Sequence, residues 1–471
     1  MGTRQRMVFC KLAVWALVLL PAAGRAQAAR DRLFGRRAEL LPCSPAPCVV
    51  PPTQVSSGGF STDTSIAASP AKSNQIVLGS LTDNCGQNSS VGALVSTDGG
   101  SDWSLDCMVE MLFNGHDFVP NDPPMVGQDR LGDVYVAAPY IVVDDSSFKF
   151  VALQKSTDGG ANWSQPVQAM GRRDTFPADP WLAVDGGSSS PYVNSIYVSG
   201  VLIGPLSNNS KNEVIVSHSR DAGTTWQEVA VAPFQSYPDN DLYTNMTVGK
   251  DGTVYLTWMY CDTGPYRCNN NKGHMLFSKS TDGGNTWSTP TTMTTVNLLP
   301  TPLPNTNVGV TNIPTIGVDN SNGPNAGTLY VVMYAWTGTY MRVQVIRSMD
   351  GGNTWSRPVP VAPPSDTHDQ FFPWLSVSST GLVGVSWLDR RNDPANINYQ
   401  AFAAISSDGG KSFQPDVQLT DVFSNPNDSG SNDGYIGDYT GNTWAGSTFV
   451  AAWMDSNNGT VQEVVGGIRL K

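Results

Sequence analysis

The sequence predicts an all-β fold, a β-propeller built from four-stranded antiparallel blades. The first observation is the motif STDGGNTWS at 280–288, which recurs in similar form six times, starting at Ser96, Ser156, Ser219, Ser280, Ser348 and Ser406. These starts lie 58 to 68 residues apart, and two short apolar runs precede each copy. The chain also holds 46 Gly and 33 Pro with only 14% charged residues, a turn-rich composition. A repeat of this length that carries several short strands is typical of a propeller blade.

The elements of one repeat follow from its residues. In 244–260, two runs rich in Thr, Val and Tyr flank a Gly-Lys-Asp-Gly turn, which predicts a hairpin of first and second strands. A third strand then runs into the motif and a fourth leaves it. Within the motif, Ser and Asp are expected to bind the turn backbone and the Gly pair to adopt positive φ, while the Trp packs on the sheet. The motif is therefore predicted to hold a blade together and not to perform chemistry.

Counting first hairpins gives seven blades. The first hairpin is 65–81, and the last is 441–455, followed by a third strand at 461–471 that has no motif and no fourth strand. Because a closed ring needs that strand, we expect 48–57 to supply it. The prediction is a seven-bladed propeller over 55–471, preceded by a segment, 29–54, that contains the ring-closing strand. Six blades with a decorated terminus is the alternative.

The first 28 residues are predicted to be a signal peptide. A positively charged start precedes the apolar run LAVWALVLLPAA, and Ala26-Gln27-Ala28 forms an A-x-A cleavage site. No other segment is apolar enough to suggest a membrane span. We therefore expect a secreted or periplasmic protein.

Cysteine usage agrees with export. Without Cys10 in the leader, six Cys remain, and their proximity suggests the pairs Cys43–Cys48, Cys85–Cys107 and Cys261–Cys268. An even number of Cys in an exported chain favours disulfides, although six allow fifteen pairings. A zinc site is the weaker alternative, because no C-x-x-C spacing occurs and only four His are present.

The charge pattern limits the partners. The formal net charge is −12, and 35 of the 40 acidic residues are Asp, a residue suited to turns. Nucleic acid is excluded as a partner, since phosphate binding needs a basic surface. We expect a monomer.

The repeated motifs resemble the Asp-box, also called the bacterial neuraminidase repeat, and the chain resembles the sialidase superfamily over nearly all of 55–471. This resemblance implies a glycan-cleaving enzyme, although Asp-boxes also occur in noncatalytic propellers. In sialidases, the Arg of an Arg-Ile-Pro motif joins two other Arg to bind the substrate carboxylate. The nearest match here is Asn312-Ile313-Pro314, with Asn in place of Arg.

The motifs lie on one rim, so a site is expected on the opposite rim, around the channel mouth. Loops leading into first strands bring an Asp there in five blades: Asp122, Asp179, Asp241, Asp369 and Asp438. These residues are interpreted as turn caps, or as a carboxylate ring that binds Ca²⁺ or flanks a glycosidic bond. The candidate catalytic residues are Asp179, Asp241 and Asp389.

The stretch WLDRRNDPANINYQ at 387–400 brings Arg390 and Arg391 to the predicted mouth. Such Arg forks bind the carboxylates of uronic or sialic acids, and the alternative is an Arg–Asp network that makes the loop rigid. The candidate substrate-binding residues are Arg390, Arg391, Arg173, Arg267, Tyr260 and Tyr439.

Two hypotheses result from these features. The first is a sialidase-like glycoside hydrolase acting on a terminal or anionic glycan, with no cofactor required, no assigned metal ligands and Ca²⁺ as an option. The second is a noncatalytic propeller that binds glycan or protein at the mouth.

Overall fold

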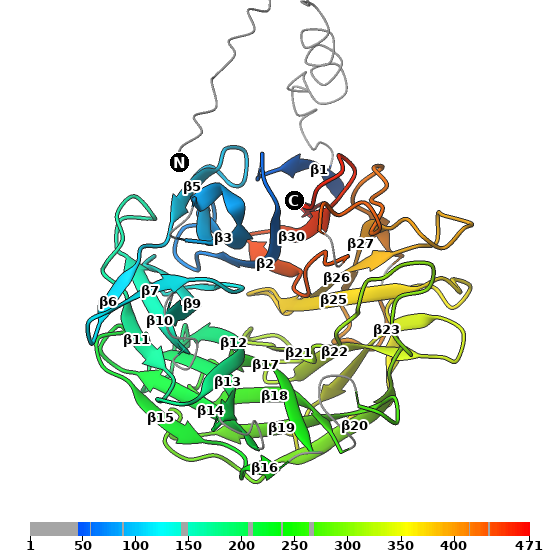
Figure 1. The fold of residues 1–471 in the computed structure, drawn as a ribbon. Helices are drawn as coiled ribbons and strands as arrows, with labels where there is room; N and C mark the ends of the chain where they lie inside the picture. Colours follow the sequence, from blue (N-terminus) through cyan, green and yellow to red (C-terminus); the bar gives the residue numbers. More distant parts are fainter. Residues whose placement is uncertain are drawn as a thin grey trace, which may run out of the picture. The chain divides into compact units, whose positions relative to one another are not determined.

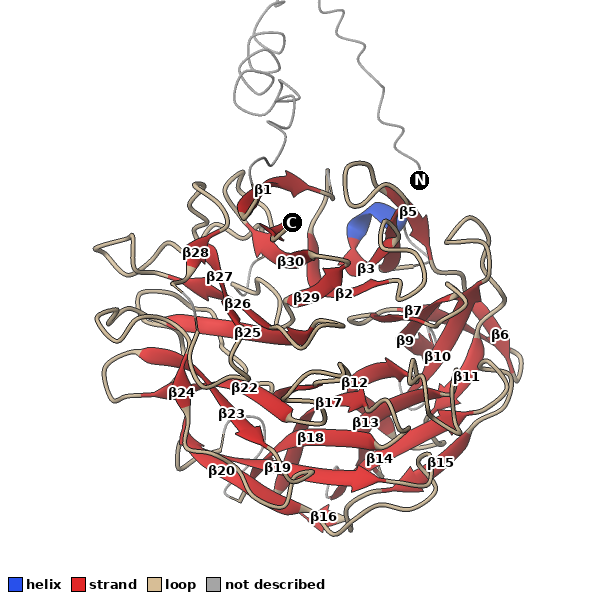
Figure 2. Ribbon diagram, turned by 180° about the vertical axis from the view of Figure 1, so that it is seen from behind, coloured by secondary structure: helices blue, strands red, loops and turns tan. Residues whose placement is uncertain are grey.

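The computed structural model describes residues 46–471 apart from 57, 87–88, 143–148, 206–210, 237–238, 263–267, 414 and 432–433. Seven antiparallel sheets form a ring, the predicted seven-bladed propeller (Figure 1). The first strand of each sheet contacts the first strands of both neighbouring sheets, so the ring is closed around a central channel. Within the described residues the one helix is η1 (Asp83–Cys85), as Figure 2 shows.

The blades are numbered from the first hairpin. Blade 1 contains β2 (Ser61–Ala68), β3 (Ile76–Thr82), β4 (Val91–Ser96) and β5 (Ser104–Cys107). Blade 2 contains β8 (Met125–Gln128), β9 (Val134–Val142), β10 (Lys149–Ser156) and β11 (Val167–Met170), and β6 (Met111–Phe113) and β7 (His116–Pro120) extend it. Blade 3 contains β12 (Phe176–Val184), β13 (Ile196–Gly204), β14 (Lys211–Ser219) and β15 (Gln227–Ala230), with the short β16 (Gln235–Ser236).

Blades 4 to 6 follow the same plan. Blade 4 contains β17 (Asn240–Val248), β18 (Val254–Cys261), β19 (Lys272–Ser280) and β20 (Thr291–Asn297). Blade 5 contains β21 (Thr315–Val318), β22 (Leu329–Trp336), β23 (Met341–Ser348) and β24 (Val359–Pro360). Blade 6 contains β25 (Gln370–Val377), β26 (Val383–Asp389), β27 (Gln400–Ser406) and β28 (Val417–Gln418).

Blade 7 is closed by the N-terminal strand, as predicted. It contains β29 (Gly441–Ala445), β30 (Thr448–Asp455), β31 (Gln462–Arg469) and β1 (Cys48–Gln54). The antiparallel pairing of β1 with β31 runs from Cys48 opposite Arg469 to Gln54 opposite Val464. This pairing joins the two ends of the propeller and supplies the fourth strand that the C-terminal repeat lacks.

The six Ser-x-Asp turns have the expected hydrogen bonds. In each turn the Ser hydroxyl donates to the Asp carboxylate and accepts the N–H of the Gly four residues later, as Ser280 does with Asp282 and Gly284, both at 2.8 Å. Gly284 has a φ of +92°, a conformation that side chains disfavour. The turns follow the third strands, on the rim opposite the loops that lead into first strands.

Two predicted disulfides are confirmed, Cys85–Cys107 in blade 1 and Cys261–Cys268 at the end of β18. Cys43 lies outside the described residues, as do the predicted signal peptide and Cys10. Between residues 46 and 471, no described helix is long and apolar enough to cross a membrane.

Candidate functional site

Two adjoining cavities open at the channel mouth. The first, of about 260 Å³, lies where the first strands of blades 2 to 4 begin and contains Asp122, Asp179 and Asp241. The second, of about 370 Å³, lies beside the loops that lead into β21 and β29. Both are lined by Tyr243, Tyr435 and Asp438, so they form one continuous site.

Bulges in the first strands place side chains in this site. The pairing of β12 with β13 shifts between Ala178 and Trp181, and Asp179 inside that bulge has a φ of +49°. The pairing of β17 with β18 shifts likewise between Leu242 and Asn245, around Tyr243 with a φ of +57°. A residue inserted at a bulge changes the direction of its side chain, which here brings it to the channel.

The bulge residues of neighbouring blades are linked by hydrogen bonds. The Tyr243 N–H donates to Asp179 Oδ2 at 3.2 Å, between blades 3 and 4. In blade 1, Asp63 accepts the N–H groups of Asp438 and Tyr439 at 2.6 and 3.2 Å and the Tyr435 hydroxyl at 2.7 Å. Asp63 therefore fixes the loop that brings Tyr435, Asp438 and Tyr439 to the mouth.

Asp122 and Asp179 hold protons at unusually high pH. Both side chains are only partly exposed. Burial raises the pKa of Asp179 to about 6, against the Tyr243 hydrogen bond, and the charge of Asp122 adds to the rise. Burial also raises the pKa of Asp122 to about 6, with Lys149 opposing the rise and Asp63 adding to it. Two like charges in one poorly solvated cavity disfavour the doubly ionised state.

Asp241 lies deeper in the first cavity, with 1% of its surface exposed. Its Oδ1 accepts the Trp258 indole N–H at 2.8 Å, whereas Oδ2 has no hydrogen-bond partner among the described residues. Burial raises the pKa of Asp241 to about 7, against the hydrogen bond from Trp258 and with a contribution from Asp239. The hydroxyl of Tyr439, a residue that is 4% exposed and lines the same cavity, is also buried without a described partner.

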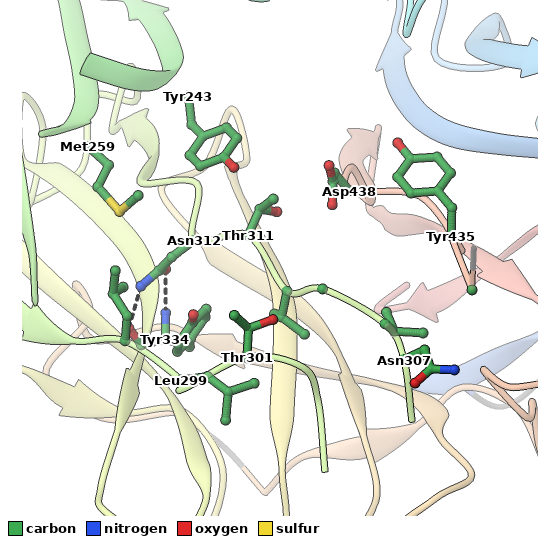
Figure 3. Close-up of a pocket in the computed structure, with 15 residues that line it drawn as sticks. Tyr243, Met259, Leu299, Thr301, Asn307, Thr311, Asn312, Tyr334, Tyr435 and Asp438 are labelled. Carbon is green, nitrogen blue, oxygen red and sulfur yellow. Dashed lines mark hydrogen bonds between the residues drawn. The ribbon is translucent and has the colours of Figure 1, made fainter. Parts of the chain in front are cut away.

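The second cavity is lined mainly by uncharged groups. Figure 3 shows Tyr435 and Asp438 on one side of it and Tyr243, Thr311 and Asn312 on the other. Asn312, which stands where the sialidase resemblance implies Arg, donates to the Tyr334 carbonyl at 2.9 Å and accepts the Tyr334 N–H at 3.0 Å. The Asn312 amide thus pairs with the backbone of β22, and it carries no charge with which to bind a carboxylate.

The predicted residues Asp389, Arg390 and Arg391 lie in blade 6 and line neither mouth cavity. Arg391 contacts three carboxylates: Asp366 at 3.0 Å, Asp389 at 2.6 Å and Asp416. Arg390 is fully buried and donates to the backbone carbonyls of Pro304 and Asn396, each at 2.8 Å. This arrangement is the loop-stabilising network that was the alternative for these residues.

The other predicted residues are dispersed. Tyr439, Asp179 and Asp241 share the first cavity. Arg173 is exposed and lines a separate cavity of about 310 Å³ at the start of blade 3, beside Arg172 and Lys211. Tyr260 packs at the end of β18 against His274, with ring centroids 6.0 Å apart, and Arg267 lies outside the described residues.

Four of the five loop Asp residues expected at the mouth line the site, namely Asp122, Asp179, Asp241 and Asp438. The residue that the prediction missed is Tyr243. Tyr243 stands where blade 3 has Asp179, so an alignment of the first strands would have found it. Among the described residues, no three His, Cys, Asp or Glu side chains gather as a metal site, and Ca²⁺ binding stays a prediction.

Comparisons with known proteins concern the fold. No family model matches the sequence, and no curated protein matches it significantly. The structure is similar to the intramolecular trans-sialidase of Ruminococcus gnavus, with a TM-score of 0.50 and 13% identity over 77% of this chain and 97% of that one. A weaker similarity is to a Dyadobacter fermentans protein of unknown function, with a TM-score of 0.49 and 13% identity over 91% of this chain and 100% of that one. Another is to the α-L-arabinofuranosidase of Fusarium graminearum, with a TM-score of 0.47 and 13% identity over 74% of this chain and 92% of that one. At such identities the trans-sialidase similarity establishes a shared fold.

Proposed function

We propose that the protein hydrolyses glycosidic bonds at the channel mouth, using Asp122 and Asp179. The observation that carries this proposal is that two partly exposed carboxyls share one cavity, both with a pKa of about 6. Glycoside hydrolysis needs one protonated carboxyl to protonate the leaving oxygen and one carboxylate to act as base or nucleophile. A pair that holds a single proton supplies both groups.

Each residue then has a defined task. One carboxyl of the pair donates its proton to the glycosidic oxygen, and the other either attacks the anomeric carbon or activates a water. Asp241 and Tyr439 lie in the same cavity with unpartnered oxygens and are positioned to bind sugar hydroxyl or amino groups. Tyr243 and Tyr435 offer rings on which sugars stack.

Three further features support a glycan as the ligand. The Ser-x-Asp turns resemble the Asp-box of sialidases, and the fold is shared with a protein described as a trans-sialidase. The two disulfides fit an exported protein that meets extracellular glycans. Secretion itself remains part of the proposal.

An uncharged sugar fits the mouth better than an anionic one. None of the described residues that line the two cavities is Lys, Arg or His. Binding of a carboxylate by Arg390 and Arg391 remains the alternative, and it would require their buried network to open. Arg173, which is exposed, would bind an anionic glycan only outside the mouth.

The experiment is a panel of fluorogenic glycosides, neutral, uronic and sialic, assayed with wild type, Asp122→Asn, Asp179→Asn and Arg391→Lys. The exposed Asp102, on the opposite rim, provides the control variant Asp102→Asn. We expect neutral glycosides to be cleaved, with either mouth variant slowing turnover by about 100-fold or more. The rate should peak near pH 6 and fall on both sides, because the pair must hold one proton.

Full activity in both mouth variants would remove this pair from the mechanism. If only sialosides are cleaved, and Arg391→Lys loses this activity while it stays folded, the active site lies at Arg391 in blade 6. A folded protein that releases no product from any glycoside would favour the second candidate, a noncatalytic glycan-binding propeller. That candidate is supported by Asn312, which stands in place of the arginine that the resemblance implies and pairs with the Tyr334 backbone.

A further inference from the structure

The mouth cavities carry an unbalanced charge. Asp122, Asp179, Asp241 and Asp438 line them, and none of their described lining residues is a cation. Among the described residues, Lys149 is the cation that acts on Asp122, and it packs over the Phe176 ring at 4.3 Å. Asp63 and Asp239 lie behind this set and add further negative charge.

Two buried oxygens in the first cavity have no described partner. They are Asp241 Oδ2 and the Tyr439 hydroxyl, on side chains that are at least 96% buried. A buried polar atom without a hydrogen bond is costly in a folded protein, and in a cavity a ligand can complete its contacts. Once ionised, which for Asp241 means above about pH 7, a carboxylate only accepts hydrogen bonds, so the group that completes the contacts of ionised Asp241 is a donor.

We infer that the ligand of this mouth is an amine-bearing glycan, held with its ammonium group between Asp179, Asp241 and the hydroxyl of Tyr439. This inference rests on the proposed function for the identity of the ligand as a glycan. An ammonium group carries three donors and a positive charge, so it satisfies unpaired carboxylates that a sugar hydroxyl only partly satisfies. Tyr243 and Tyr435, whose side chains also line the site, add aromatic surface that favours a cation.

The second cavity indicates the length of the ligand. It continues from the first past Tyr243, Tyr435 and Asp438 and is lined by uncharged groups such as Thr301, Asn307 and Val308. A single sugar unit in the first cavity would therefore leave this adjoining space empty. The ligand is expected to have at least two units, with the charged unit in the first cavity.

Binding of an ammonium group should also change the protonation of the mouth carboxyls, which can be measured. Without ligand, burial keeps protons on Asp179 up to about pH 6 and on Asp241 up to about pH 7. An ammonium group nearby favours the ionised carboxylates and so expels these protons, which leaves Asp122 as the member of the catalytic pair that keeps a proton. Binding should therefore release protons and tighten as the pH rises from 5 to 7, whereas an uncharged sugar would bind best with the protons in place.

The test is calorimetric titration with the β-1,4-linked glucosamine dimer, its N,N′-diacetylated form and cellobiose, at pH 5, 6 and 7, in two buffers of different ionisation enthalpy. The diacetylated dimer keeps the linkage and removes only the charge. We expect the free amine to bind at least about tenfold more tightly at pH 6, where the amine is itself protonated, with net proton release. Asp241→Asn should abolish this preference, Tyr439→Phe should weaken it, and Asp102→Asn should leave it unchanged.

Equal binding of the three disaccharides, or a preference that survives Asp241→Asn, would overturn the inference. The two proposals fail separately. Release of product from neutral glycosides without any preference for amines would support the hydrolase proposal and contradict the amine-bearing ligand. Preferential binding of the glucosamine dimer without turnover of any glycoside would support the amine-binding site and contradict the hydrolase proposal.

Discussion

The corner of blade 6 and the channel mouth are both rich in buried Asp, yet they differ in how these carboxylates are balanced. In blade 6, Arg391 contacts Asp366, Asp389 and Asp416 and stacks over the Phe402 ring at 4.2 Å. At the mouth, Asp122, Asp179 and Asp241 line one cavity, and none of the described residues that line it is a cation. The carboxylates around Arg391 are balanced by that guanidinium, although Arg390 beside it keeps two buried nitrogens without a described partner, whereas the mouth carboxylates have no such cation.

The pKa values record part of this difference, because burial raises the pKa of Asp389 to about 6 even beside Arg391. Burial alone would raise the pKa of Asp366, but the His368 N–H and the charge of Arg391 outweigh it and lower the value. Hydrogen bonds and charge from its three Asp partners likewise raise the pKa of Arg391, although burial opposes this. At the mouth no comparable partner offsets burial, so the pKa of Asp241 rises to about 7. Charged residues in a sequence thus indicate a binding site only when the fold leaves them without partners.

The largest effect is expected from Arg391→Ala. The substitution removes the common partner of three poorly solvated carboxylates, and burial already raises the pKa of Asp389. Losing one member of a buried ion pair costs roughly 3–5 kcal/mol, and we expect the upper end of that range. Denaturant unfolding at pH 7 measures it, with the exposed Arg173→Ala as control. A loss below about 1 kcal/mol, typical of surface ion pairs, would show that the network is not structural.

A smaller effect of opposite sign is expected from Asp241→Asn. The folded protein holds the Asp241 proton up to about pH 7, whereas the unfolded chain loses it near 3.8. Wild-type stability therefore falls as the pH rises between these values, by about 1.4 kcal/mol for each pH unit. Asn mimics the protonated acid and carries no such penalty. The variant should equal wild type near pH 3.5 and exceed it by about 4 kcal/mol above pH 7.

Unfolding of both proteins at pH 3.5, 5.5 and 8 gives this difference directly. A variant that is less stable than wild type at pH 8 would mean that Asp241 is ionised and held by a partner, as Asp366 is. The mouth would then resemble blade 6, and the comparison would lose its basis.

The sequence was sufficient to predict the fold because its determinants are local. The Ser280 turn needs only hydrogen bonds within five residues, and hairpin spacing sets the number of blades. Even the closing strand followed from a deficit, since the repeat after 441 lacks a fourth strand that 48–54 could provide. Six copies of one motif gave the same prediction independently.

The site was predicted less well because its determinants are distant in sequence. Asp179 and Asp241 were identified from their loops, but the cavity that joins them to Tyr435 and Asp438 exists only once the ring closes. Arg390 and Arg391 were expected at the mouth because their loop joins the second and third strands of a blade, on the rim opposite the repeated motifs. Nothing local indicates that Asp366 and Asp416, 25 residues away on either side of Arg391, bind the same guanidinium.

If the mouth aspartates hold protons near neutral pH, carbon NMR of protein labelled at the Asp γ-carboxyl will detect it. We expect carboxyl resonances with midpoints of about 6 for Asp122 and Asp179 and about 7 for Asp241, each missing in the corresponding Asn variant. Addition of the glucosamine dimer should lower the midpoints of Asp179 and Asp241. If these three variants remove only resonances with midpoints below 4, the mouth carboxylates are ionised and partnered, and they do not hold protons near neutral pH.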